Sequence, residues 1–251
     1  MKANEAVNEG RRQFLQAAAA AAAGWALGST PLATRAAAAA ERGMKIGVIG
    51  SGRIGGTLGT LWVKAGHEVV FSARHLDAVK KLIDGLGPTA RAGTPEQAAV
   101  FGEVILVSVP YSALPQLGRD LAAPLKGKAV LDTCNPIPRR DGEMAAAAQA
   151  KGTGVASAEY LPGVRLVRAF NSVGYTALRS EAHRAGEKIA IPLAADDDAA
   201  LKIASRLVED AGFEPVVVGP LTRAKEFDVG TAVFGKALTA RELRRGLGIG
   251  S

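Results

Sequence analysis

Short, β-branched apolar runs alternate with stretches whose apolar residues recur at helical spacing along most of the chain. The apolar runs predict strands over 45–49, 68–72, 89–92, 103–109, 128–132, 165–170, 188–193 and 214–218. The helical stretches cover 57–65, 77–85, a segment from 94, 111–121, 142–151, 157–161, 196–211, 224–234 and 240–247. Strands alternating with helices in this way predict an α/β fold, built on an open, doubly wound parallel sheet with a small C-terminal extension of helices and strands.

Two helix starts are marked by capping residues. Thr94 has the character of an N-cap, Pro95 sits at the first helical position, and Gln97 completes a capping box. The acidic triplet at 196–198 precedes the helix that runs to about residue 211, where negative charge suits the positive end of the helix dipole. Three acids in a row can also indicate a metal site, but capping accounts for them here.

A glycine-rich loop joins the first strand to the first helix. The glycines Gly50, Gly52 and Gly55 are spaced G-x-G-x-x-G, directly after an apolar strand and directly before a helical stretch. In a dinucleotide site the first glycine permits the tight turn, the second lets a pyrophosphate touch the backbone, and the third lets the helix lie close to the sheet. The helix N-terminus then offers free N–H groups to the phosphates. The loop predicts a dinucleotide site formed by Gly50, Ser51, Gly52, Arg53, Ile54 and Gly55, and the alternative is a purely structural turn.

The end of the second strand favours NADP over NAD. NAD sites usually have an acidic residue there to hold the ribose hydroxyls, whereas this chain continues as Ser72-Ala73-Arg74-His75 with no carboxylate before Asp77. A hydroxyl and a guanidinium bind a 2′-phosphate by charge-assisted hydrogen bonds, and Arg53 adds charge from the glycine loop. We therefore expect Ser72, Arg74 and His75 to surround the 2′-phosphate. Alternatively, Arg74 is a solvated residue at the start of the next helix.

Composition and charge exclude several other classes of function. The 251 residues are 48% hydrophobic, enough for a full core, and the net charge of +7 is spread out, with no basic run beyond Arg244-Arg245 that could bind nucleic acid. Cys134 is the only cysteine, so no internal disulfide can form. The histidines His67, His75 and His183 lack ligand spacing, so we expect no metal site.

Residues 1–40 have the pattern of a twin-arginine signal peptide. A polar start carries Arg11-Arg12-Gln13-Phe14-Leu15, an alanine-rich run follows, and Ala-x-Ala cleavage choices lie at 36–40. The apolar run is too short and too rich in Ala and Gly to span a bilayer, so the mature chain is expected to have no transmembrane segment. We expect a periplasmic protein that loads its nucleotide in the cytoplasm and is exported folded. An uncleaved anchor and a misassigned start codon are the alternatives.

Further motifs, in the same order along the chain, give a specific resemblance. They are the glycine loop, Ser72-Ala73-Arg74, Val107-Ser108-Val109-Pro110, Asp132-Thr133-Cys134-Asn135-Pro136, Val167-Arg168-Ala169-Phe170-Asn171 and Gly219-Pro220-Leu221. The chain resembles the NADPH:coenzyme F(420) oxidoreductase family, whose fold also forms the cytosolic domain of the six-transmembrane metalloreductases. The resemblance implies an NADP-binding Rossmann domain at 44–183, a small C-terminal subdomain at 184–251, and hydride transfer between NADP(H) and a flavin or deazaflavin.

The resemblance also implies roles for particular residues. Arg74 matches the arginine that holds the 2′-phosphate, while Ala73 departs from the serine or asparagine usual before it. Val109-Pro110 matches the loop along the nicotinamide ribose, and Asn135-Pro136 the segment beside the amide. Asn171 and Val173, expected to form the acceptor pocket, fall where the deazaflavin reductases tend to have His and Ile, and Asn171 is closer to the metalloreductase type.

Hydride transfer between two stacked rings requires no side-chain acid or base, and we expect no catalytic residue. Ser172 and Tyr175 are either hydrogen-bond donors to a bound ring or ordinary cap and core residues, and Cys134 is expected to pack as a small apolar residue under the nicotinamide loop. Two other functions stay open. One is a small-substrate dehydrogenase of the related fold, which usually adds a long helical domain, and the other is a non-catalytic exported module that binds NADP and senses redox state. The expected partner is a small-molecule electron acceptor, and a homodimer is left open.

Overall fold

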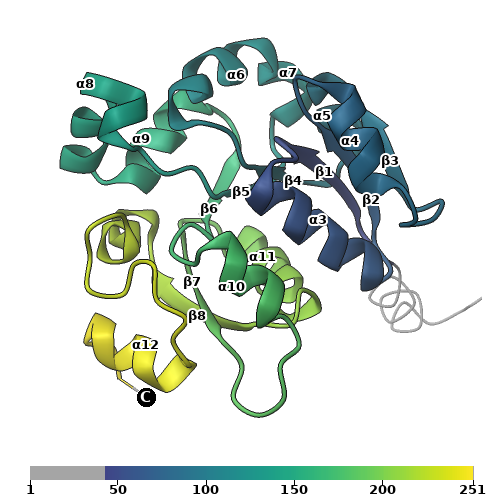
Figure 1. Ribbon diagram of the computed structural model, residues 1–251. Helices are drawn as coiled ribbons and strands as arrows, with labels where there is room; N and C mark the ends of the chain where they lie inside the picture. Colours follow the sequence, from purple (N-terminus) through teal and green to yellow (C-terminus); the bar gives the residue numbers. More distant parts are fainter. Residues whose placement is uncertain (1–42, 251) are drawn as a thin grey trace, which may run out of the picture. The chain divides into compact units, whose positions relative to one another are not determined.

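The computed structural model describes residues 43–250, so the signal peptide expected at 1–40 lies outside the described residues. Gly43–Ser251 is one compact unit. Its eight strands form one sheet in the order β3-β2-β1-β4-β5-β6-β7-β8 (Figure 1). The strands are β1 Lys45–Ile49, β2 Glu68–Ser72, β3 Ala90–Gly93, β4 Val104–Val107, β5 Ala129–Asp132, β6 Arg165–Arg168, β7 Ala190–Ala195 and β8 Glu214–Gly219. The α/β fold with a doubly wound sheet is therefore confirmed.

Helices connect the strands over most of the described chain. They are α3 Arg53–Lys64, α4 Leu76–Ile83, α5 Pro95–Phe101, α6 Leu114–Asp120, α7 Ala122–Leu125, α8 Pro138–Lys151, α9 Thr153–Tyr160, α10 Tyr175–Ser180, α11 Asp198–Asp210 and α12 Ala240–Leu247, with 3-10 turns η1 Tyr111–Ala113 and η2 Leu221–Phe227. Both predicted caps are confirmed. Thr94 and Gln97 form the capping box of α5, and the Asp197 side chain accepts from the Ala200 N–H at 2.7 Å at the start of α11.

Two hydrophobic layers cover the two faces of the sheet. One layer joins α3, α4, α10 and α11 to the sheet, and the other joins α5, α6, α7 and α9 to the opposite face. Trp62 of α3 is fully buried in the first layer, where its indole N–H donates to the Leu207 carbonyl of α11 at 2.8 Å. Since α3 starts at the glycine loop, this packing holds the loop in place.

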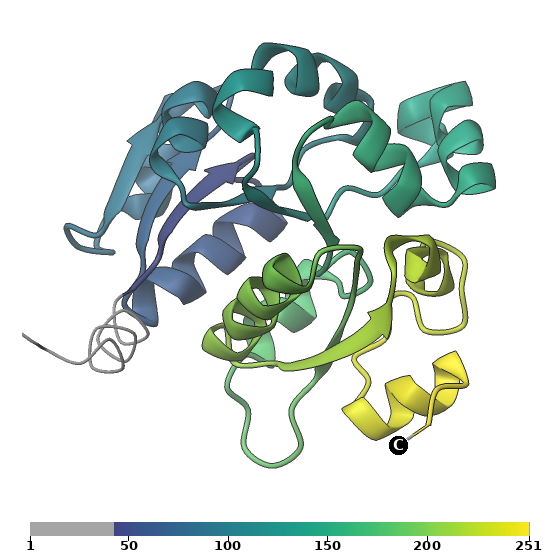
Figure 2. The same cartoon turned by 180° about the vertical axis from the view of Figure 1, so that it is seen from behind.

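The C-terminal strands extend the same sheet. β7 runs antiparallel to β6 and parallel to β8, so the direction of the sheet reverses after β6. A third apolar cluster packs α12 and the segment 224–233 on this end of the sheet, which Figure 2 shows from behind. The helix predicted over 224–234 was wrong: the chain makes the 3-10 turn η2 and leaves it at Phe227, with glycines at positive φ at 230 and 235. Helix α10 was not predicted.

The strand order creates the expected crevice at the carboxyl edge. β1 pairs with β2 on one side and β4 on the other, so the connections from these neighbouring strands leave in opposite directions. The register aligns Ile49 with both Ser72 and Val107. The glycine loop, the segment after β2 and the segment after β4 therefore start beside one another.

Candidate functional site

The glycine loop makes a tight turn between β1 and α3. The N–H groups of Gly50 and Ser51 both donate to the Ser72 carbonyl, at 3.0 and 2.8 Å, which ties the loop to the end of β2. Gly52 is the N-cap of α3, and no side chain caps this helix. The first N–H groups of α3 are thus left for a ligand at the carboxyl edge of the sheet.

The loop fits a phosphate-bearing nucleotide on two further observations. A Cβ added at Gly52 would meet no atom within 4 Å, so the backbone there borders open space that a ligand can enter. Ser51 Oγ is buried and has no hydrogen-bond partner among the described residues. Bare backbone, free N–H groups and an unpaired hydroxyl are what a pyrophosphate requires.

The expected 2′-phosphate residues divide into two groups. Arg53, Arg74 and His75 are exposed and have the freedom to meet a ligand at the ends of β1 and β2. Arg53 also lies over the Tyr175 ring, with 5.0 Å from its guanidinium carbon to the ring centroid. Ser72 differs from the prediction, because its side chain is fully buried and its hydroxyl donates to the Val48 carbonyl at 2.9 Å. The hydroxyl expected to bind phosphate instead stabilises the β1–β2 pair.

The loop expected along the nicotinamide ribose and the loop expected beside the amide lie together. The Val109 N–H points to Cys134 Sγ at 3.4 Å, which joins the loop after β4 to the loop after β5. Pro110 is the N-cap of η1, and Asn135-Pro136 leads into α8. Cys134 is buried, and burial raises the pKa of its thiol well above the ordinary value, so it packs here as a neutral side chain.

Asp141 forms a second link between these loops, which sequence reasoning missed. Its carboxylate accepts from the Ser112 N–H at 3.2 Å and from the Ile137 N–H at 2.8 Å. Burial alone would raise the pKa of Asp141, but hydrogen bonds from Arg140, Ile137 and Ser112 lower it to about 2. The carboxylate therefore stays charged throughout the physiological range and holds both loops.

A cavity of about 260 Å³ opens beside these loops, and we name it the ring pocket. Its lining includes both residues predicted for the acceptor, together with parts of the glycine loop and the C-terminal segment: Ile54, Thr133, Asn135, Phe170, Asn171, Ser172, Val173, Gly174, Tyr175, Phe234 and Gly235. Asn171 and Val173 are therefore brought together with Ile54 and Asn135. Ser172 and Tyr175 belong to the same lining.

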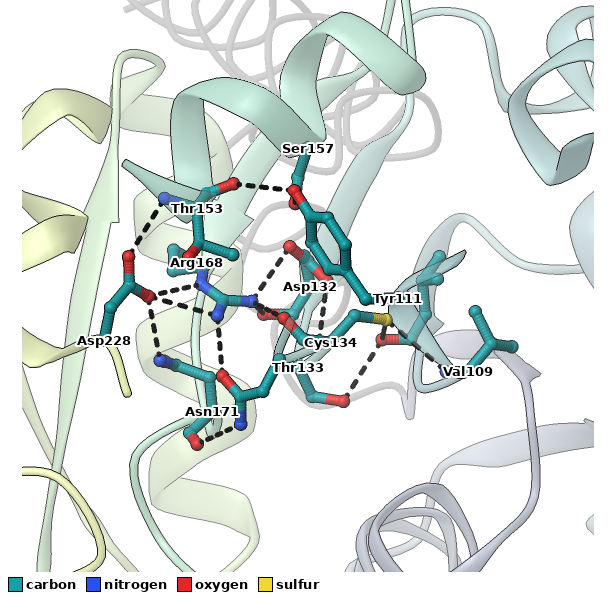
Figure 3. Close-up of polar contacts among 12 residues, drawn as sticks. Val109, Tyr111, Asp132, Thr133, Cys134, Thr153, Ser157, Arg168, Asn171 and Asp228 are labelled. Carbon is teal, nitrogen blue, oxygen red and sulfur yellow. Dashed lines mark hydrogen bonds and ion pairs between the residues drawn. The ribbon is translucent and has the colours of Figure 1, made fainter. Parts of the chain in front are cut away.

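A buried ionic cluster (Figure 3) contacts Asn135 and Asn171 of the ring pocket. The fully buried Arg168 guanidinium donates to Asp132 Oδ2 at 3.0 Å and to Asp228 Oδ1 at 3.2 Å. It also donates to the Cys134 carbonyl at 2.6 Å and to Asn135 Oδ1 at 2.9 Å. Burial alone would lower the pKa of Arg168, but the charges of Asp132 and Asp228 raise it above the ordinary value. The cluster thus fixes the Asn135 side chain, whose Nδ2 donates to the Asn171 carbonyl at 2.8 Å.

Sequence reasoning missed the part that Arg168 and Asp228 play. The signal for Arg168 was a charged residue between the apolar residues Val167 and Ala169, since buried arginines need acidic partners. The partner Asp228 is 60 residues away in a segment predicted to be helical, so no local pattern could pair them.

A second, larger cavity of about 470 Å³ begins at Gly52 and Arg53 and follows α3 between α4 and α10. Its lining carries the cations Arg53, Lys64 and Arg179 and no acidic residue.

The described residues give two negative findings. No group of three or more His, Cys, Asp or Glu side chains within 43–250 is arranged to hold a metal ion. In the same range, no helix is both long and apolar enough to cross a membrane.

Known proteins are similar to parts of this chain. Residues 45–136 match the family model described as NADP oxidoreductase coenzyme F420-dependent. The chain is 30% identical over 192 residues to Metalloreductase STEAP3 of Rattus norvegicus, covering 73% of this chain and 36% of that protein. It therefore spans about a third of the length of that relative.

Solved structures show the same fold. A putative F420-dependent NADP-reductase from Arthrobacter sp. FB24 superimposes with a TM-score of 0.66 at 20% identity, covering 78% of this chain and all (100%) of the other. An imine reductase from Myxococcus stipitatus in complex with NADP⁺ gives a TM-score of 0.53 at 19% identity, covering 72% of this chain and 57% of the other. The expected resemblance to the NADPH:coenzyme F(420) oxidoreductase family is confirmed, and the chain is related to NADP-dependent oxidoreductases.

Proposed function

We propose that this protein is an NADPH-dependent oxidoreductase that transfers hydride to a flavin or deazaflavin bound in the ring pocket. The observation that carries the proposal is the ring pocket itself. Its lining joins Ile54 of the glycine-loop helix to Asn171 and Val173 after β6. The nicotinamide of a nucleotide whose pyrophosphate lies at the glycine loop can therefore meet a second ring in this cavity.

The residues divide the work between binding and orientation. The N-terminus of α3 and the bare backbone at Gly52 bind the pyrophosphate, while Arg53 and Arg74 bind the 2′-phosphate. NADPH, when bound, supplies the hydride from nicotinamide C4. The loops after β4 and β5, joined through Cys134 and Asp141, orient the nicotinamide end. Stacking of the two rings at near-attack distance then supplies most of the rate, with no side-chain acid or base.

The acceptor half can be tested at Gly174. Val173 is buried in the main core, so a bulky residue there would disturb packing as well as the pocket. A Cβ at Gly174 meets no atom within 4 Å, and φ is −68°, so a side chain there extends into open space at the pocket. Gly174→Trp should lower the rate of NADPH oxidation with riboflavin or a deazaflavin by more than about tenfold, equivalent to ~1.4 kcal/mol in the barrier.

Stopped-flow absorbance at the NADPH band measures this rate. Gly174→Ser, a small residue that suits an N-cap, is the matched control and should retain the wild-type rate. Both variants should bind 2′-phospho-ADP-ribose like the wild type, because this fragment lacks the nicotinamide. A wild-type rate in the Trp variant would place the acceptor elsewhere. If the unmodified protein binds NADPH but reduces no flavin, deazaflavin or ferric complex, a non-catalytic NADP-binding module becomes the better account.

A further inference from the structure

One residue that lines the ring pocket has a buried polar atom without a partner. Asn171 lines the pocket and is 4% exposed, and its Oδ1 is buried without a hydrogen-bond partner among the described residues. An unpaired buried carbonyl is costly to the free protein, because it has lost its hydrogen bonds to water. Such an atom on a residue that lines a cavity indicates a group that a ligand satisfies.

The surroundings of Asn171 decide which end of its amide stays unpaired. Its Nδ2 donates to the Phe227 carbonyl at 3.2 Å and to Asp228 Oδ1 at 3.5 Å. Both neighbours are pure acceptors, so turning the amide over would set its oxygen against two other oxygens. Asp228 is itself fixed by Arg168 and by the Thr153 N–H, which donates to Oδ2 at 3.0 Å (Figure 3). The buried cluster therefore keeps the amide oxygen unpaired and the amide nitrogen engaged.

The backbone of Asn171 is fixed in the same way. Its carbonyl oxygen already accepts from Asn135 Nδ2 at 2.8 Å, and Asn135 is held by Arg168. The side-chain oxygen is thus the acceptor that Asn171 has left to offer. A ligand that presents only acceptors here leaves this oxygen unpaired, whereas a ligand with an N–H group can donate a hydrogen bond to it.

We propose that Asn171 determines the specificity of the ring pocket by accepting a hydrogen bond, through Oδ1, from an amide-type N–H of the bound ring. The inference rests on the proposed function and goes beyond it by naming the chemistry that the pocket selects. Two groups carry that N–H: the carboxamide of the nicotinamide and the ring imide N3–H of a flavin or deazaflavin.

The first arm of the test uses nucleotide binding alone. The 3-acetylpyridine analogue of NADP⁺ has a methyl ketone in place of the carboxamide and so has no N–H to donate. If the nicotinamide is the donor, the wild-type protein should bind the analogue about 3- to 10-fold more weakly than NADP⁺, the value of one neutral hydrogen bond. Asn171→Leu should abolish that difference, and Ser180→Ala, an exposed change outside the pocket lining, should preserve it.

The second arm uses the acceptor. If the acceptor ring is the donor, N3-methylriboflavin should show a KM about 3- to 10-fold above that of riboflavin in the wild type, and Asn171→Leu should make the two equal. The comparison of ligands on the wild-type protein remains informative even if Asn171→Leu folds poorly. The proposal would be overturned if the wild type distinguished neither the two nucleotides nor the two flavins. It would also be overturned if both distinctions persisted in Asn171→Leu. Failure of the wild type to bind NADP⁺ at all would instead overturn the proposed function, and this inference with it.

Discussion

The three glycines of the loop have different reasons to be glycine. A Cβ at Gly50, whose φ is +96°, would meet the Ser108 carbonyl, and a Cβ at Gly55 would meet the Gly50 carbonyl. These two glycines are required by the fold itself, whether or not a nucleotide binds. Gly52 has an ordinary φ of −75° and open space around its Cα, so the fold does not require a glycine there, whereas a bound pyrophosphate would.

This difference predicts different outcomes for the same substitution. Gly52→Val should weaken NADP⁺ binding by more than about 100-fold, or ~2.7 kcal/mol, because its side chain occupies the space of the pyrophosphate. Its free energy of unfolding should stay near that of the wild type. Gly55→Val should instead destabilise the protein by about 1–3 kcal/mol or more through overpacking. Isothermal titration and urea denaturation measure the two effects, and tight NADP⁺ binding by Gly52→Val would move the site away from this loop.

Residues at the site could be predicted where the signal is local, and not where it depends on distant partners. The glycine loop and the Asn135 and Asn171 motifs each follow an apolar strand directly, so their place at the carboxyl edge follows from the alternation of strands and helices. Ser72 was expected to bind phosphate because of its hydroxyl, but β2 is covered on both faces, so this side chain is buried and bonds to the backbone of β1.

At the scale of elements, α3 and α11 are joined at the end opposite the nucleotide loop. His67, just after α3, is buried, and the Met44 N–H donates to its Nδ1 at 2.9 Å. Its Nε2 therefore carries the proton and donates to Asp210 Oδ2 at 3.0 Å, at the last residue of α11. Burial lowers the pKa of His67 below its ordinary 6.5, although the charge of Asp210 acts in the opposite direction.

The lowered pKa predicts acid sensitivity. As the pH falls below 6.5, the histidine of the unfolded chain takes up a proton before that of the folded chain, so protonation favours unfolding. The free energy of unfolding should therefore decrease from pH 7.5 to 5.5. His67→Gln should be less stable at pH 7.5 but should lose less on acidification. Urea denaturation at the two pH values measures both slopes, and parallel slopes would show that His67 does not titrate on unfolding.

Most elements of the first half could be predicted from periodicity alone, and the C-terminal end could not. β2 was predicted with its observed bounds because a continuous apolar run ends at a polar residue on each side. After β8, by contrast, the chain is held by contacts with distant segments, such as the Leu221 N–H donating to Asp196 Oδ1 at 2.8 Å and the Thr153–Asp228 bond. Tertiary contacts and glycines therefore override the helical spacing of residues 224–234.

At the scale of the whole molecule, the charge distribution agrees with an anionic ligand near α3. The net charge of +7 is the sum of +2 on residues 1–40 and +5 on the rest. The cavity along α3 is lined by Arg53, Lys64 and Arg179. Long-range attraction of this kind raises the local concentration of a nucleotide that carries several negative charges. It also means that the affinity for NADP⁺ should fall as ionic strength rises.

We propose that the chain is exported to the periplasm by the twin-arginine route after NADP(H) has bound in the cytoplasm. The pair Arg11-Arg12 before an alanine-rich run carries the proposal, and the glycine loop explains why a folded state is exported. Arg11→Lys combined with Arg12→Lys should keep the protein in the cytoplasmic fraction, uncleaved.

Protein recovered from the periplasm should release NADP(H) when it is denatured with acid or heat, whereas exported Gly52→Val should release none. Cell fractionation and enzymatic cycling of the released nucleotide measure both outcomes. Normal export of the double variant would contradict the route, and wild-type periplasmic protein without nucleotide would contradict loading before export, because a tightly held cofactor crosses the membrane only inside the folded chain.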